Sequence, residues 1–62
     1  MSVILIFVVE SISGGLERNI EYVGTDENIV KSFTPSQFDN QDIEISVWEK
    51  GVKIDRSLIE AE

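Results

Sequence analysis

The chain has 62 residues, with twelve Asp and Glu against five Lys and Arg, and a formal net charge of −7. It has no Cys and no His, which excludes disulfides and the usual zinc sites. Acids exceed bases in both halves of the chain, so the sequence offers no basic stripe for direct binding to nucleic acid or to an anionic membrane. We therefore expect one small cytoplasmic domain over residues 1–62, with a marginal core that oligomerisation would stabilise.

The apolar run Val3–Val9 is the centre of the predicted fold. It is rich in β-branched residues and predicts a strand over about residues 2–11 that is buried on both faces. The run is too short for a transmembrane helix, and no Lys or Arg precedes it as in a signal peptide. A short helix covers only one face of such a strand. The second face needs the C-terminal hairpin or a second copy of the chain, most simply in a C2 homodimer.

The pair Gly14–Gly15 predicts a hairpin turn, after which residues 16–23 return as a second strand. Arg18, Ile20 and Tyr22 alternate with polar residues, as on one face of a strand. The apolar residues of this segment also recur at helical spacing, so a helix is the alternative. A phosphate-binding loop would need a Lys and a following helix, and the glycine pair has neither.

Two short helices are predicted between the second and third strands. Thr25 is the expected N-cap of the first, because two acids follow it in the first turn. The sequence Thr34-Pro35-Ser36-Gln37 predicts the start of the second, with Pro at the first helical position and Gln three residues after the cap. The side chains expected to face the core are Ile29, Val30, Phe33 and Phe38.

Residues 42–49 alternate most clearly between apolar and polar side chains, and residues 52–55 resume the alternation after a turn at Glu49-Lys50-Gly51. Residues 55–59 either extend the fourth strand or begin a frayed helix, and the last few residues are expected to be disordered. The fold class is therefore α+β, an antiparallel sheet of about four strands with one or two short helices between strands 2 and 3. The alternative is a nearly all-β chain in which residues 25–40 are irregular.

No catalytic or metal-binding pattern is present. General acid–base and nucleophilic chemistry draw mostly on His, Cys, paired carboxylates or a Ser beside a base, and none of the serines lies in a nucleophile-elbow sequence. The oxygen-rich stretch 39–44 has Ile43 at the third ligand position of a calcium loop and lacks its Gly. We expect no enzymatic activity and no cofactor.

The strongest binding candidate is Trp48, which shares a strand face with Glu44 and Ser46, opposite Ile43, Ile45 and Val47. An exposed Trp among carboxylates is typical of an interface anchor. The alternative is that Trp48 folds over the sheet edge or packs under the C-terminal residues. The candidate partner-binding residues are Trp48, Glu44, Glu49, Asp42, Tyr22 and Glu21.

These features predict a non-enzymatic acidic protein-binding module that engages a basic protein. Its sharpest form is a phage-like inhibitor or DNA mimic, whose carboxylates imitate phosphates and occupy the groove of a nucleic-acid-binding protein. The alternative is a small homo-oligomeric structural or accessory subunit. In that case the first strand supplies the interface and the acidity only confers solubility.

Overall fold

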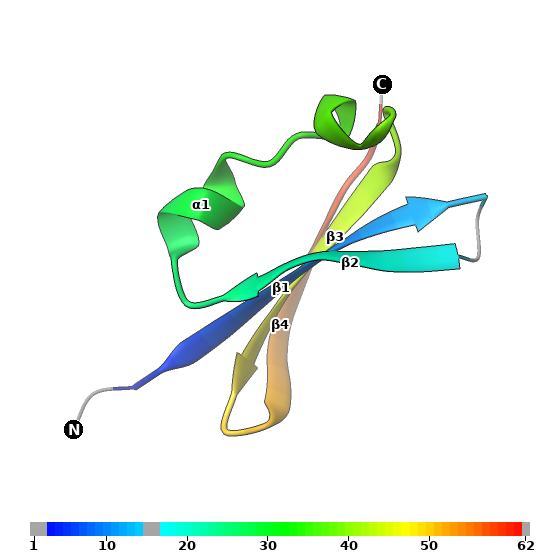
Figure 1. Cartoon of the computed structure of the whole chain (residues 1–62). Coiled ribbons are helices and arrows are strands. Elements are labelled where there is room, and N and C mark those ends of the chain that lie inside the picture. Colours follow the sequence, from blue (N-terminus) through cyan, green and yellow to red (C-terminus); the bar gives the residue numbers. More distant parts are fainter. Residues whose placement is uncertain (1–2, 15–16, 62) are drawn as a thin grey trace.

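The computed structural model describes residues 3–14 and 17–61. It contains four strands, one α-helix and one 3-10 helix (Figure 1). In chain order these are β1 Leu5–Ser13, β2 Glu17–Gly24, α1 Glu27–Lys31, the 3-10 helix η1 Pro35–Phe38, β3 Asp42–Glu49 and β4 Val52–Ile59. The predicted four-stranded antiparallel sheet is confirmed. The α+β assignment is confirmed only in part, because the structure is mostly sheet (58%) with small helical pieces.

The sheet has the strand order β2-β1-β3-β4, with every neighbouring pair antiparallel. Two hairpins, β1–β2 and β3–β4, are joined side by side through β1 and β3. The most apolar segment of the chain is therefore a central strand with a partner on each edge. This topology explains why β1 is so rich in β-branched residues, which pack well on a pleated surface.

Three predicted boundaries differ from the structure. β1 is predicted over residues 2–11 but runs over Leu5–Ser13, and residue 2 lies outside the described part of the chain. The second strand is confirmed over a helix at Glu17–Gly24, while residue 16 also lies outside the described part. Of the two alternatives for residues 55–59, extension of the fourth strand beyond residue 55 is confirmed over a frayed helix. β4 continues to Ile59 because it pairs with β3 as far as Ile43.

Both hairpin turns use left-handed backbone conformations. Gly14 has φ +60°, and Gly15 lies outside the described residues. The β3–β4 turn has φ of 52° at Lys50 and 81° at Gly51. Positive φ at both central residues is the requirement of a type I′ turn, whose twist matches that of the flanking strands.

The helix α1 begins one residue later than predicted, whereas η1 begins where it is predicted to begin. Asp26 is the N-cap of α1, and its Oδ1 accepts hydrogen bonds from the backbone N–H groups of Asn28 (2.9 Å) and Ile29 (3.4 Å). Thr25 is therefore not the cap. At η1, Gln37 Oε1 accepts from the backbone N–H of Thr34 at 3.0 Å, as the capping-box pattern predicts.

The core lies between the sheet and α1. Phe7 and Val9 of β1 are buried against Val30 of α1, and partly buried side chains surround them. Those side chains are Leu5, Tyr22, Phe33, Ile45 and Val47. Phe33 also contacts Phe38 of η1, with ring centroids 5.6 Å apart. Ile29 is wrongly predicted to face the core, since it is exposed on the outer side of α1.

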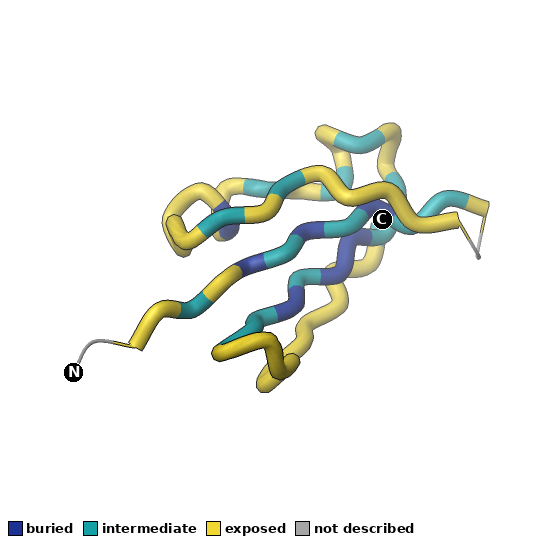
Figure 2. Tube along the Cα trace, turned by 60° about the horizontal axis from the view of Figure 1, so that its bottom comes forward, coloured by how far each residue is buried: buried dark blue, intermediate teal, exposed yellow. Residues whose placement is uncertain are grey.

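The prediction that β1 is buried on both faces is wrong. α1 and η1 cover one face of the sheet, called here the helix face (Figure 1). The C-terminal hairpin does not fold over the other face, because β4 pairs with β3 and extends the sheet sideways. In Figure 2 the buried residues are concentrated in the two central strands, while β4 is exposed along its whole length.

Candidate functional site

The uncovered side of the sheet, called here the open face, is the candidate functional site. Directly paired residues in antiparallel strands lie on the same face, so the strand registers define its members. On the central strands they are Ile6, Val8, Glu10 and Ile12 of β1 and Asp42, Glu44, Ser46 and Trp48 of β3. On the edge strands they are Arg18, Ile20 and Val23 of β2 and Lys53, Arg56 and Leu58 of β4.

An ion-pair cluster lies at the centre of the open face. Glu44 is only 4% exposed, and it pairs with Arg18 Nη1 at 3.2 Å and with Lys53 Nζ at 3.5 Å. Arg18 comes from one edge strand and Lys53 from the other, so the long side chains of both reach inward over the sheet. Glu44 also lies directly opposite Glu10 in the β1–β3 register. Like charges in that position destabilise a sheet, and the two cations offset the repulsion.

Electrostatics keeps Glu44 ionised. Burial by itself raises the pKa of the carboxyl group, but the ion pair with Arg18 and the nearby charges of Lys53 and Arg56 together lower it below its ordinary value. A general acid at neutral pH needs a raised pKa, so Glu44 is unsuited to that role. Its arrangement is that of a structural carboxylate which holds two edge strands to the centre of the sheet.

Trp48 lies along the sheet instead of projecting from it. Its Nε1 donates a hydrogen bond to Ser46 Oγ at 3.1 Å, and Ser46 is buried. Lys53 Nζ lies 5.8 Å from the centroid of the indole ring, within the range of a cation–π contact. Trp48 and Lys53 therefore form a layer of side chains over the β3–β4 half of the open face.

The β1–β2 half of the open face is an exposed apolar patch. Ile20 is 66% exposed and Val23 57%, and both flank Ile6, Val8 and Ile12 of the neighbouring strand. No described element packs on these side chains, because α1 lies on the other face and β4 lies at the far edge. An exposed apolar patch bordered by polar side chains is typical of a binding surface.

Charge is divided unequally between the open face and the rest of the protein. The ionisable side chains of the open face are Glu10, Asp42, Glu44, Arg18, Lys53 and Arg56. They are three acids and three bases, so this face is formally neutral. Elsewhere in the described residues, eight acids face only two bases, Lys31 and Lys50. The acidity of the chain is therefore concentrated off the open face.

The structure brings three of the six predicted site residues together. Trp48, Glu44 and Asp42 lie on the open face, and Asp42 Oδ1 accepts a hydrogen bond from the backbone N–H of Ala61 at 2.8 Å. Glu44 is not the solvated carboxylate that a phosphate mimic needs, because it is buried and paired with two cations.

The other three predicted residues lie off the open face. Tyr22 packs against Phe33 with ring centroids 5.8 Å apart, and its hydroxyl accepts from the backbone N–H of Asp26 at 3.4 Å. Glu21 Oε2 accepts a hydrogen bond from the buried Ser11 Oγ at 2.6 Å. Glu49 pairs with Leu5 at the end of β3. Tyr22 and Glu21 therefore support the core and its border.

A β-bulge explains why the residues of β2 are misassigned from sequence. The register shifts between Val9 and Glu10, so that Val9 pairs with Tyr22 while Glu10 pairs with Ile20. The extra residue, Glu21, interrupts the alternation and turns Tyr22 to the helix face while Ile20 stays on the open face. Arg18, Ile20, Val23 and Lys53 are among the open-face residues that the sequence did not predict as site residues. The alternation at Arg18 and Ile20 was the available signal for two of them.

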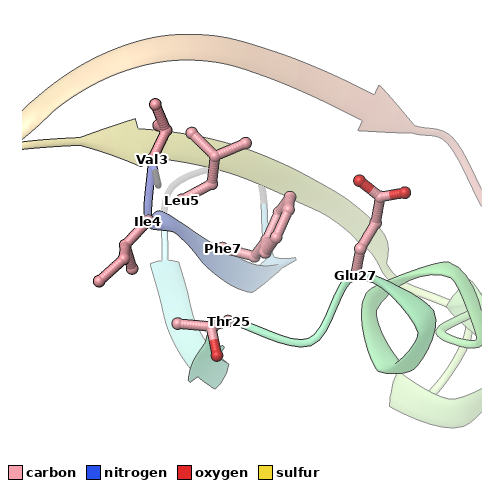
Figure 3. Close-up of a pocket in the computed structure, with 6 residues that line it drawn as sticks. All are labelled: Val3, Ile4, Leu5, Phe7, Thr25 and Glu27. Carbon is pink, nitrogen blue, oxygen red and sulfur yellow. The ribbon is translucent and has the colours of Figure 1, made fainter. Parts of the chain in front are cut away.

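A groove of about 510 Å³ lies between the start of β1 and the entry to α1 (Figure 3). Its lining residues are Val3, Ile4, Leu5, Phe7, Thr25 and Glu27. Glu27 is the only charged group among them, and it is already paired with Lys31 at 2.8 Å. Small-molecule sites orient a ligand with several converging polar groups, and this groove does not provide them.

Within residues 3–14 and 17–61, no three Asp or Glu side chains are grouped so that they could hold a metal ion. No helix in this part of the chain is long and apolar enough to cross a membrane. Comparison of the chain with protein-family models, curated proteins and solved structures finds no match. The open face is therefore the feature of the chain that bears on its function.

Proposed function

We propose that this chain is a non-enzymatic protein-binding module and that the open face is its binding surface. The observation that carries the proposal is the apolar patch around Ile20 and Val23, left uncovered on the neutral face of a strongly acidic chain. Burying exposed apolar surface is worth about 25 cal/mol per Å². A partner that covers this patch gains that free energy without having to desolvate an excess of one charge.

Sequence chemistry supports the non-enzymatic part of the proposal. The chain lacks His and Cys, and Glu44, the one buried carboxylate among the described residues, is held in the ionised form by Arg18 and Lys53. A binding role uses these same groups without demanding proton transfer. The ion pairs fix the edge strands to the centre of the sheet, and the fixed strands hold the side chains of the open face in place.

The proposal can be tested by site-specific photo-cross-linking in the cells that express the chain. A benzophenone amino acid replaces either Ile20 on the open face or Val52, which is similarly exposed (66% and 61%) but pairs with Glu49 on the opposite side of the sheet. We expect a cross-linked protein adduct from position 20 and none from position 52. Equal yields from the two positions, or no adduct from position 20, would contradict the proposal.

A second candidate function is favoured by the charge distribution. The eight described acids off the open face retain a strongly negative surface, which suits a basic partner such as a nucleic-acid-binding protein. The acidic surface that would imitate DNA then lies on the helix face and along the β2 edge, where Glu17 and Glu21 are exposed. Glu44, paired and buried on the open face, has no part in it. This function predicts binding to a basic protein that weakens steeply with added salt, and salt-insensitive binding would refute it.

A further inference from the structure

We infer that the partner of the open face is a second copy of this chain, in a two-fold symmetric dimer packed sheet to sheet. The inference rests on the proposed function, since it names the occupant of the same surface. An isologous interface places the same surface on both subunits, so the open face, with its apolar patch and its balanced charges, contacts its own copy. In such a dimer α1 of each subunit lies on the outside and the two sheets form the middle layers.

The shape of the molecule fits this arrangement. It is elongated and thin, with principal extents of 40 × 22 × 14 Å. A standard protein interface buries about 800 Å² on each partner, so a stable dimer has to use most of the open face. Both copies have the same twist, and two twisted sheets pack face to face at about 10 Å.

The balance of charge on the open face favours it as the surface through which two copies bind each other. Two chains with net charge −7 repel each other, and contact through the helix face would bring together acids such as Glu49 and Asp55, which pair with Leu5 and Val47 on that face. The open face carries equal numbers of acids and bases. Contact there buries the apolar patch, while the acids elsewhere remain in solvent and keep the dimer dispersed.

The small size of the core gives an energetic reason for dimerisation. The buried hydrophobic residues of the described chain are only Phe7, Val9, Val30 and Ile43. Domains of this size usually need a disulfide, a metal or a partner, and the chain has no Cys or His to supply the first two. A dimer adds a second apolar layer to β1, and thereby gives that strand the cover on both faces that its sequence calls for.

Sedimentation velocity from micromolar to millimolar concentration tests the inference. We expect a species of twice the 7.0 kDa chain mass at high concentration. Ile20→Asp is expected to raise the dissociation constant about tenfold or more, because it places a charge in the centre of the buried patch. Val52→Asp, the control at the other side of the sheet, should dimerise like the wild type. Circular dichroism establishes that each variant is folded, and Val23→Asp replaces Ile20→Asp if the latter is not.

The outcomes separate the two proposals. A wild-type chain that stays monomeric at millimolar concentration overturns the dimer. If position 20 nevertheless cross-links to a different protein, the proposed function stands with another occupant. If the wild type is monomeric and position 20 cross-links to nothing, both proposals fail. A dimer that Ile20→Asp and Val23→Asp leave intact while Val52→Asp disrupts it overturns the assignment of the interface to the open face.

Discussion

At the scale of single residues, Glu44 links the stability of the fold to the shape of the open face. It is the only residue that contacts cations from both edge strands, among the described residues, and it lies opposite a second carboxylate, Glu10. Removing its charge leaves Arg18 and Lys53 without their partner. Because both cations are partly exposed, water compensates for some of the loss.

We therefore predict that Glu44→Gln lowers the free energy of unfolding by about 1–2 kcal/mol at neutral pH. The folded-state pKa of Glu44 lies below the ordinary value of 4.5, so its contribution is complete above pH 4.5. It is lost as pH falls through the folded-state pKa. Urea denaturation across this range should show the wild type and variant converging at low pH. Glu17→Gln, at an exposed carboxylate, is the control, with an expected change below about 0.5 kcal/mol.

A gap between wild type and Glu44→Gln that stays constant from neutral to acidic pH would contradict this prediction. It would mean that the variant perturbs packing and that the ion pairs contribute nothing measurable. Arg18→Gln provides a second check, because it removes the shorter of the two ion pairs while it leaves the carboxylate in place.

At the scale of elements, two substitutions in the β3–β4 turn are predicted to change the free energy of unfolding in opposite directions. Gly51 has φ +81° and open space where the Cβ of an alanine would lie, so Gly51→Ala adds backbone strain alone and should cost about 1 kcal/mol. Lys50 also has positive φ, and Lys50→Asn creates the Asn-Gly pair that type I′ turns prefer. We expect a gain of about 0.5 kcal/mol. Thermal unfolding of both variants measures the two changes in stability. If both variants were stabilised, or both destabilised, the assignment of a type I′ turn would be refuted.

The start of α1 gives a second prediction at this scale. Asp26→Ala removes the acceptor of two backbone N–H groups and should lower stability by about 1 kcal/mol. Thr25→Ala, one residue earlier, is the matched control and should have little effect on α1. The free energies of unfolding of both variants, measured by chemical denaturation, show which of the two residues caps α1. If Thr25→Ala proved the more damaging substitution, Thr25 would be the cap after all.

The elements also show where sequence reasoning works and where it stops. Local signals are read correctly at η1, where Pro35 and Gln37 mark the helix start, and in β3, where alternation places Trp48 and Glu44 on one face. The bulge at Glu21 has no comparable local signal, and it turns Tyr22 to the opposite face. The burial of Glu44 depends on side chains from two other strands, so no window along the chain contains the information.

At the scale of the whole molecule, the division of charge connects the fold to its proposed role. Most of the described acids lie off the open face, which is formally neutral and carries an exposed apolar patch on its β1–β2 half. In the proposed dimer, a chain of net charge −7 would associate through this one surface and keep most of its acids in solvent. The dimer would also cover the apolar side chains of β1 that the single chain leaves only partly buried on the open face.

The most direct test of the dimer is NMR of the isoleucine methyl groups, because isoleucines lie on both sides of the sheet. Methyl spectra of the isoleucine-labelled chain, recorded at high and low concentration, compare Ile6, Ile12 and Ile20 on the open face with the exposed Ile29 on α1. We predict that the open-face methyl resonances move with concentration while those of Ile29 stay fixed. Resonances that ignore concentration, or that move at Ile29 alone, would contradict the claim that the open face binds a second copy.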